Sequence, residues 1–341
     1  MSRLSSLALL LLAAACTAKP ADQARQPADS APLGAHQQRH SSFGARILAT
    51  VGDSASTIEG IAAHGGTLYV ADWKDGTIYA VDTTGAVSRA GSFGTKPGTW
   101  ILGLVTDSAG ALYAAVPEAG QVLKVPAGRL GAADFDPAKD VTVFASGATG
   151  ANALALDAKG HLWISGGNSG ALYHVGPAGG RAQLFAKDYS PISPDTTIPV
   201  RPYTVNGVAV DPQVAHVFTA NTGTGEIVEL EILPGYRKGK ARTVVKDAFL
   251  TGADGLLLDE RGGLWVAANF RNTVAKVRTT DGMITLLRAD TVAQGAVLRF
   301  PAELKKVGRT FYVANLNFPA GANAGQPFKG ASIAALELPG I

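Results

Sequence analysis

A short apolar phrase recurs six times along the chain, at intervals of 43 to 54 residues. Each copy opens with one leading residue, continues with a small residue and then runs into apolar positions. The leading residues are Glu59, Leu102, Asn152, Asn206, Asp254 and Pro301. About a dozen residues later each copy has a second apolar segment, rich in aromatic or β-branched residues, such as LYVAD at 68–72 and LWISG at 162–166.

Within a copy, the alternation of hydrophobic and polar positions separates four short strands. In the fifth copy these are residues 254–259, 263–267, 273–277 and 283–287, with turn residues between them at hairpin spacing. No helical period runs through any long window. Repeats of roughly 40–50 residues with several short strands are typical of β-propeller blades. The sequence therefore predicts an all-β fold, a six-bladed β-propeller.

Two further strands, at residues 46–51 and 332–338, lie outside this pattern. A propeller needs its two ends joined, and pairing an N-terminal strand into the last blade removes exposed sheet edges. We expect the strand at 46–51 to complete the blade that contains residues 301–338. The propeller then spans residues 45–341.

Four of the six leading residues carry side-chain oxygen atoms: Glu59, Asn152, Asn206 and Asp254. Equivalent positions in a closed ring lie at one height around its axis, so these side chains should converge there. Two carboxylates and two amides would be costly if dry and unpaired, and a divalent cation would compensate them. Oxygen donors favour calcium, magnesium or manganese over zinc or copper. In the alternative interpretation these residues only hydrogen-bond one another or cap the strand starts.

Residues 206–211 (NGVAVD) and 254–267 (DGLLLDERGGLWVA) resemble the senescence-marker-protein/gluconolactonase (sugar lactone lactonase) family. The resemblance covers about residues 57–315. It implies a six-bladed propeller that holds a divalent metal in its central channel and hydrolyses lactones. It also implies that Glu59, Asn206 and Asp254 bind the metal, that Asn152 contacts substrate or water, and that Asp254 is the acid/base residue. We expect calcium as the cofactor, with magnesium, manganese and zinc as alternatives.

The chain departs from that family pattern at two places. Glu59 is followed by Gly-Ile-Ala rather than by Gly-Pro and a tryptophan. Gly150 stands where relatives that act on sugar lactones often carry an arginine. Arg201 and Arg299 precede the fourth and sixth copies, and Trp100 precedes the second. We expect these three side chains to reach the mouth of the pocket and bind substrate.

These observations predict a divalent-metal-dependent hydrolase whose partner is a small-molecule lactone or ester. The cation would polarise the carbonyl, and Asp254 would take a proton from water as general base. The alternative is a non-catalytic binding propeller of the NHL type, in which the polar channel is structural and the rim holds a partner.

The first residues predict export. Residues 1–15 carry one positive charge, Arg3, and an apolar run at 7–15 that is too short to span a bilayer. Cys16, the only cysteine, follows three alanines and resembles a bacterial lipidation site. Ordinary cleavage at a small-residue site is the alternative. Residues 16–44 then form a flexible tether rich in Ala, Pro, Gln and Ser.

We therefore expect a monomeric lipoprotein of the periplasm or cell envelope, attached to a membrane through its lipid only. Thr17 after the cysteine favours the outer membrane. A net charge of +3 and the absence of a basic stripe with interleaved aromatic residues exclude a nucleic-acid partner.

Overall fold

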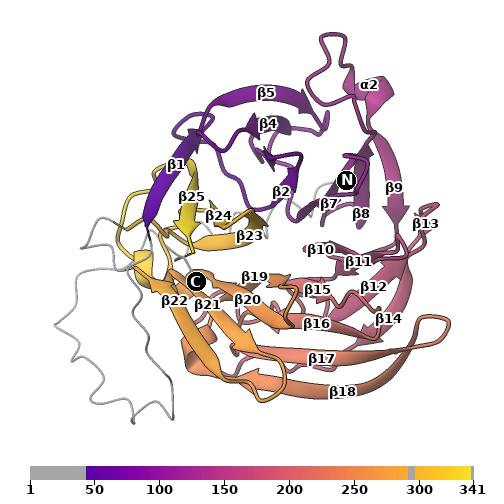
Figure 1. Cartoon of the computed structure of the whole chain (residues 1–341), viewed down its shortest axis with the longest axis vertical. Helices are drawn as coiled ribbons and strands as arrows, with labels where there is room; N and C mark the ends of the chain where they lie inside the picture. The colour runs from indigo at the N-terminus through magenta and orange to yellow at the C-terminus, as the bar shows by residue number, and fades with distance from the viewer. Residues whose placement is uncertain (1–43, 291–295, 339–341) are drawn as a thin grey trace, which may run out of the picture. The chain divides into compact units, whose positions relative to one another are not determined.

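Six antiparallel sheets follow one another around a ring in the computed structural model, which describes residues 44–290 and 296–338 (Figure 1). These residues belong to one compact unit. Each sheet is one blade with its first strand innermost, so the predicted six-bladed β-propeller is confirmed. The predicted export signal, Cys16 and the tether up to residue 43 lie outside the described residues.

The strands of the first three blades run from the centre outward in sequence order. Blade one holds β2 (Ile61–His64), β3 (Thr67–Ala71), β4 (Thr77–Val81) and β5 (Val87–Ser92). Blade two holds β6 (Leu104–Thr106), β7 (Leu112–Val116), β8 (Gln121–Val125) and β9 (Thr142–Ser146), and the short β13 (Gly180–Arg181) pairs in parallel with β9. Blade three holds β10 (Leu154–Leu156), β11 (Leu162–Ser165), β12 (Ala171–Val175) and β14 (Gln183–Lys187).

The remaining blades follow the same plan. Blade four holds β15 (Val208–Val210), β16 (His216–Asn221), β17 (Glu226–Leu233) and β18 (Arg237–Lys246). Blade five holds β19 (Ala253–Leu258), β20 (Gly263–Ala268), β21 (Thr273–Arg278) and β22 (Ile284–Ala289). Blade six holds β23 (Pro301–Val307), β24 (Thr310–Asn315), β25 (Ala331–Glu337) and β1 (Ala45–Val51). Short helical turns α2 (Pro137–Asp140), η1 (Ala248–Leu250), η2 (Asn269–Arg271) and η4 (Gly321–Asn323) lie in the links.

Blade six is built from both ends of the described chain. β1 pairs antiparallel with β25, from Ala45 opposite Leu336 to Val51 opposite Ala331. In Figure 1 the indigo β1 lies beside the yellow β25. The predicted closure is confirmed: β1 is hydrogen-bonded into the last blade, and the chain continues from β1 directly into blade one.

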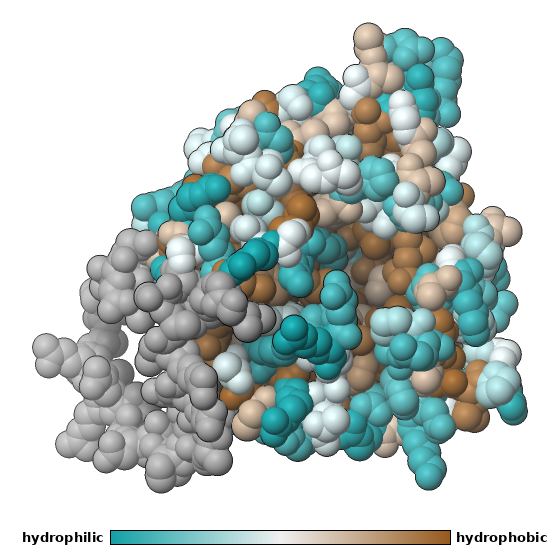
Figure 2. Space-filling model, viewed as in Figure 1, coloured by the Kyte–Doolittle hydropathy of each residue, from teal (hydrophilic) through white to brown (hydrophobic). Residues whose placement is uncertain are grey.

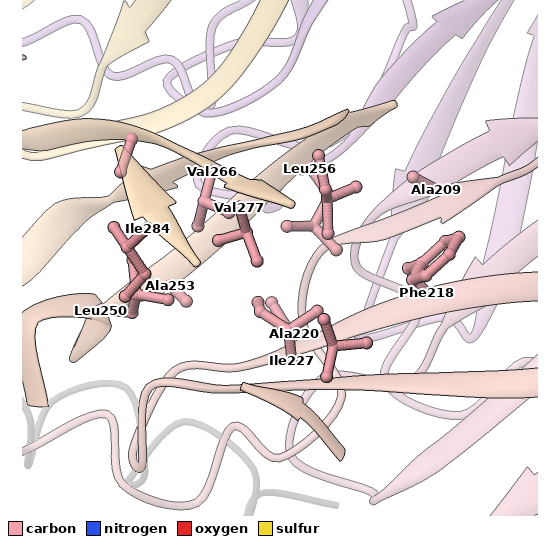
Figure 3. Packing of buried hydrophobic residues seen from close by; sticks show 13 residues of the cluster. Ala209, Phe218, Ala220, Ile227, Leu250, Ala253, Leu256, Val266, Val277 and Ile284 are labelled. Atoms are coloured by element: carbon pink, nitrogen blue, oxygen red, sulfur yellow. The ribbon is translucent and has the colours of Figure 1, made fainter. Parts of the chain in front are cut away.

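The hydrophobic core lies between neighbouring blades, where the faces of two sheets pack on each other. Figure 3 shows one such contact between blades four and five, made by Ala209, Phe218, Ala220, Ile227, Leu256, Val266, Val277 and Ile284. Full burial of a leucine, isoleucine or phenylalanine side chain stabilises a fold by roughly 1.5–3 kcal/mol. Figure 2 shows polar side chains around the periphery of the molecule, with hydrophobic atoms visible nearer its middle. No helix among the described residues is long and apolar enough to cross a membrane.

In blades two, three and five, an aspartate in the turn between the first and second strands accepts hydrogen bonds from that turn and from an aromatic side chain. In blade three, Asp157 Oδ1 accepts the backbone N–H groups of Lys159 and His161. Its Oδ2 accepts the indole N–H of Trp163 at 3.2 Å and the hydroxyl of Tyr236 at 2.9 Å. In the same way, Asp107 and Asp259 each accept hydrogen bonds from backbone N–H groups of their own turn and from the aromatic side chain six residues further along the chain. One carboxylate thus fixes both the turn and a large buried ring.

Replacing Asp157 with alanine should lower the free energy of unfolding by about 3 kcal/mol, because the buried indole N–H of Trp163 and the half-buried hydroxyl of Tyr236 lose their acceptor. Chemical denaturation would measure the change. Asp82→Ala is the matched control, since Asp82 bonds only its own exposed turn. Equal losses for the two variants would contradict the role assigned to the bonds with the aromatic residues.

Candidate metal centre

The innermost strands approach one another most closely where they begin. Gly103 N–H donates to the carbonyl of Asn152 in the next blade at 2.9 Å. A Cβ atom added at Gly60, Gly103 or Gly255 would come within 2.4–2.6 Å of the next blade's backbone, and at Gly207 within 1.9 Å. Only a residue without a side chain fits such contacts. This explains why a small residue follows the leading residue.

The sixth copy is offset by one residue from the predicted alignment. The carbonyl that faces Gly255 belongs to Ala302, whereas Gly103 and Gly207 face the carbonyls of the leading residues Asn152 and Asp254. The strand register shifts between Pro301 and Glu303. Ala302, not Pro301, is therefore the leading residue of blade six, and the prediction was wrong there. Glu303 consequently occupies the position that is small in the other blades.

The structure brings the predicted oxygen-bearing residues together and adds a third carboxylate. Glu59, Asn152, Asn206, Asp254 and Glu303 are all buried, each with at most 6% of its surface exposed. Burial raises the pKa of Glu59 well above its ordinary value, and the charges of Asp254 and Glu303 raise it further. Burial, followed by the charge of Glu303, also raises the pKa of Asp254. The three carboxylates therefore lie close enough to repel one another.

Several oxygen atoms of this cluster have no hydrogen-bond partner among the described residues: Glu59 Oε2, Asn152 Oδ1, Asn206 Oδ1 and Asn269 Oδ1. The amide of Asn206 is held by its nitrogen, which donates to Thr222 Oγ1 at 2.9 Å and leaves the oxygen free. Buried lone pairs without a donor are costly, and a hard cation satisfies them. The donor set therefore fits a divalent cation of the calcium or magnesium type.

Among the described residues, no three His, Cys, Asp or Glu side chains alone are arranged to hold a metal ion. A cation here would accordingly need amide oxygens as well as carboxylates. The metal-binding role of Glu59, Asn206 and Asp254 stays a prediction.

Two residues beside the cluster were missed by the sequence analysis. Asn269 Nδ2 donates to Asp254 Oδ2 at 3.0 Å and so orients that carboxylate. Tyr203, in the link before β15, has its pKa raised by burial and then by the charges of Glu59 and Asp254, so its hydroxyl lies within the field of the cluster. A sequence signal existed only for Asn269, because it directly follows the second strand of its blade, as the polar Thr222 does in blade four.

An aromatic surface lies on the same side of the ring as the carboxylate cluster. The rings of Trp73 and Trp100 stack at 5.2 Å with 18° between their planes, and Phe318 meets Trp73 edge-on at 6.0 Å. Trp73 Nε1 donates to the carbonyl of Ile101 at 2.7 Å, which ties blade one to the start of blade two. Because strand direction alternates within a blade, the links that carry these rings emerge where the innermost strands begin.

The two predicted arginines lie in the links before β15 and β23. Arg201 is exposed and Arg299 is partly exposed. No hydrogen bond or ion pair joins either guanidinium to the carboxylate cluster among the described residues. A positively charged side chain next to the cluster is that of Lys305, whose Nζ lies 3.3 Å from Glu303 Oε1. The substrate-binding role of Arg201 and Arg299 stays a prediction.

No family model and no curated protein matches the chain. Several solved structures are similar to it. A luciferin-regenerating enzyme superposes with a TM-score of 0.65 at 15% identity, covering 88% of this chain and 96% of its own. A gluconolactonase from Xanthomonas campestris gives 0.59 at 17%, covering 86% and 90%. Regucalcin, a calcium-binding protein from Agrobacterium tumefaciens, gives 0.60 at 15%, covering 86% and 95%. This likeness shows a shared fold, and it supports the resemblance seen in residues 206–211 and 254–267.

Metal-free protein should lose stability as the pH rises. The folded-state pKa values of Glu59 and Asp254 lie above the ordinary values of 4.5 and 3.8, so both groups hold protons more tightly in the folded state. Their stabilising contribution is complete below those ordinary values and is lost as the pH rises through the raised pKa values. Urea denaturation of metal-stripped protein between about pH 4 and pH 8 should show the decline, and calcium should reverse it at the upper end.

Glu59→Gln should flatten this pH dependence, because one titrating group is removed while the side-chain shape is kept. A metal-free wild-type protein that becomes more stable over the same pH range would contradict the assignment.

Proposed function

We propose that this chain is a divalent-metal-dependent hydrolase of lactones or related esters. The observation that carries the proposal is the set of unpaired, buried oxygens of Glu59, Asn152 and Asn206 beside the carboxylate of Asp254. Fold neighbours that include a gluconolactonase and a calcium-binding regucalcin support it. The ligand is a small molecule, because the polar centre is confined to the converging starts of the innermost strands.

Glu59, Asn206 and Asp254 would hold the cation through oxygen, which favours calcium, with magnesium, manganese or zinc as alternatives. When bound, a hard cation polarises a lactone carbonyl and stabilises the negative charge that develops on its oxygen. Asn152 would position the substrate or the attacking water through its free Oδ1.

Asp254 would act as the general base. Its Oδ2 is fixed by the amide of Asn269, and that bond holds the carboxylate in one orientation. The proton of the attacking water would pass to Asp254 as the water oxygen adds to the carbonyl carbon. The ester C–O bond would then break, and Asp254 would return the proton to the departing alkoxide oxygen. Asp254 is only 5% exposed, so little bulk water reaches its carboxylate.

The aromatic surface favours substrates whose non-reacting part is apolar. Trp100 is stacked on Trp73, and Phe318 extends the surface towards Phe300 at 5.7 Å. Gly150 offers no guanidinium to a sugar hydroxyl. We propose a lactone or ester with an aliphatic or aromatic substituent that packs against Trp100. Export and lipidation at Cys16 are further proposals, which rest on the sequence alone.

Asp254→Asn should reduce kcat for lactone hydrolysis by about a thousandfold, since the general base is lost. The assay is a panel of lactones with metal-reconstituted protein, after elemental analysis of the purified protein. Glu226→Gln is the control, because Glu226 is a buried carboxylate in blade four that bonds Ser190 and Thr243 instead. A fully active Asp254→Asn variant would remove Asp254 from the mechanism, and a wild-type protein that binds no divalent ion would end the proposal.

Trp100→Ala should raise KM about tenfold for lactones with an aromatic or aliphatic substituent and leave kcat nearly unchanged, because the ring binds substrate and transition state alike. Unsubstituted lactones serve as the comparison. A drop in kcat with constant KM would show that Trp100 does not bind the substituent.

A further inference from the structure

Thr222 lies directly after β16 and contacts both of the blades that supply Asn206 and Asp254. Only 1% of its surface is exposed. Its backbone N–H donates to the carbonyl of Tyr203 at 3.0 Å, and its carbonyl accepts the N–H of Gly252 at 2.8 Å. These two bonds fix the residue between the link before β15 and the turn before β19.

The hydroxyl of Thr222 forms a chain of hydrogen bonds between the two blades. It donates its single proton to the carbonyl of Ala253 at 2.9 Å. It accepts the side-chain N–H of Asn206, also at 2.9 Å. Ala253 immediately precedes Asp254, so the chain joins the amide of one leading residue to the peptide unit that carries the next.

This chain of hydrogen bonds decides which way the amide of Asn206 faces. A backbone carbonyl only accepts, so the proton of the Thr222 hydroxyl must point to Ala253. The remaining lone pairs of the hydroxyl need a donor, and only the nitrogen end of an amide supplies one. Asn206 Nδ2 therefore faces Thr222, and Oδ1 lies at the other end of the amide, buried and without a partner.

Asn269 has the corresponding place in blade five, directly after β20. Its Nδ2 donates to Asp254 Oδ2 at 3.0 Å. In both blades the residue after the second strand holds the leading side chain of its own blade, and its chemistry matches, with an acceptor for an amide and a donor for a carboxylate. In blade three that place is taken by Gly166, which has no side chain to hold Asn152.

We propose that Thr222 is a positioning residue of this centre, whose hydroxyl holds the Asn206 amide with its oxygen directed into the cluster. Without the hydroxyl, Asn206 Nδ2 and the Ala253 carbonyl would both lose their partner. The amide would then be free to turn its nitrogen towards the cluster, where an N–H group repels a cation. The use of the amide oxygen for a cation rests on the proposed function, whereas the orientation of the amide does not.

Exchange of the Asn206 amide protons with solvent tests this orientation in metal-free protein. Thr222→Val removes the hydroxyl at nearly constant shape, and Thr222→Ser keeps it. The two Nδ2 protons are followed by NMR in ¹⁵N-labelled protein and are identified by their loss in Asn206→Ser. We expect exchange at least about tenfold faster in Thr222→Val and within about twofold of wild type in Thr222→Ser, because only the serine variant keeps an acceptor for Nδ2.

Calcium titration in a calorimeter tests what the orientation does. We expect the calcium Kd to rise at least about tenfold in Thr222→Val and to stay within about threefold of wild type in Thr222→Ser. Thr273→Val is the matched control and should change neither amide exchange nor calcium affinity. Thr273 is fully buried in blade five, and its hydroxyl donates to the Arg271 carbonyl instead.

Thermal unfolding of each metal-free variant verifies that it is folded, and Thr222→Ala replaces Thr222→Val if the valine variant does not fold. Equal exchange and equal affinity in Thr222→Val and wild type would overturn the positioning role. Equal losses in Thr222→Val and Thr222→Ser would also overturn it, since the exact fit of threonine rather than its hydroxyl would then be responsible. A wild-type protein that binds no divalent ion would end the metal-dependent hydrolase, and the exchange rates alone would then decide the role of Thr222.

Discussion

The close approach of the innermost strands is the constraint on which the rest of this structure depends. Closure through β1 and β25 fixes the ring, and the ring forces the starts of six strands to meet. At that level backbone atoms of neighbouring blades are in direct contact, as the bond between Gly103 and Asn152 shows. A large residue there would push blades apart, so the chain has glycine or alanine in five of six copies, and the leading side chains can project into one small space.

That geometry concentrates polar groups where water is scarce. Like charges at Glu59, Asp254 and Glu303 oppose folding, and they are tolerated because packing between the blades is distributed around the whole ring. A site of this kind stores free energy that a cation can recover on binding. The fold does not fix the chemistry, since proteins with this architecture include a luciferin-regenerating enzyme and a calcium-binding protein.

Most of the architecture could be predicted because it follows from local patterns. Strand alternation, turn residues and the repeat length gave six blades and their closure. The leading residues Glu59, Asn152, Asn206 and Asp254 could be found because each precedes a small residue. The prediction was wrong in the sixth copy because Pro301 followed by Ala302 has the same pattern as a leading residue followed by a small one. The bulge that shifts the register there arises from the pairing of β23 with β24, which is a property of the folded chain. Tyr203 and Trp73 could not be predicted, since their positions depend on links that meet only in the folded ring.

Glu303 shows how a single exception to the repeat can change a site. In five blades the second position is small because the neighbouring backbone occupies the space. In blade six the side chain fits because the adjacent residue, Gly255, has none. A carboxylate placed there would be unsupported if it stood alone, but the strand period also brings Lys305 to the same face. The exception and its counter-ion therefore form one ion pair within the ring, and a substitution at either residue leaves the other charge without its partner.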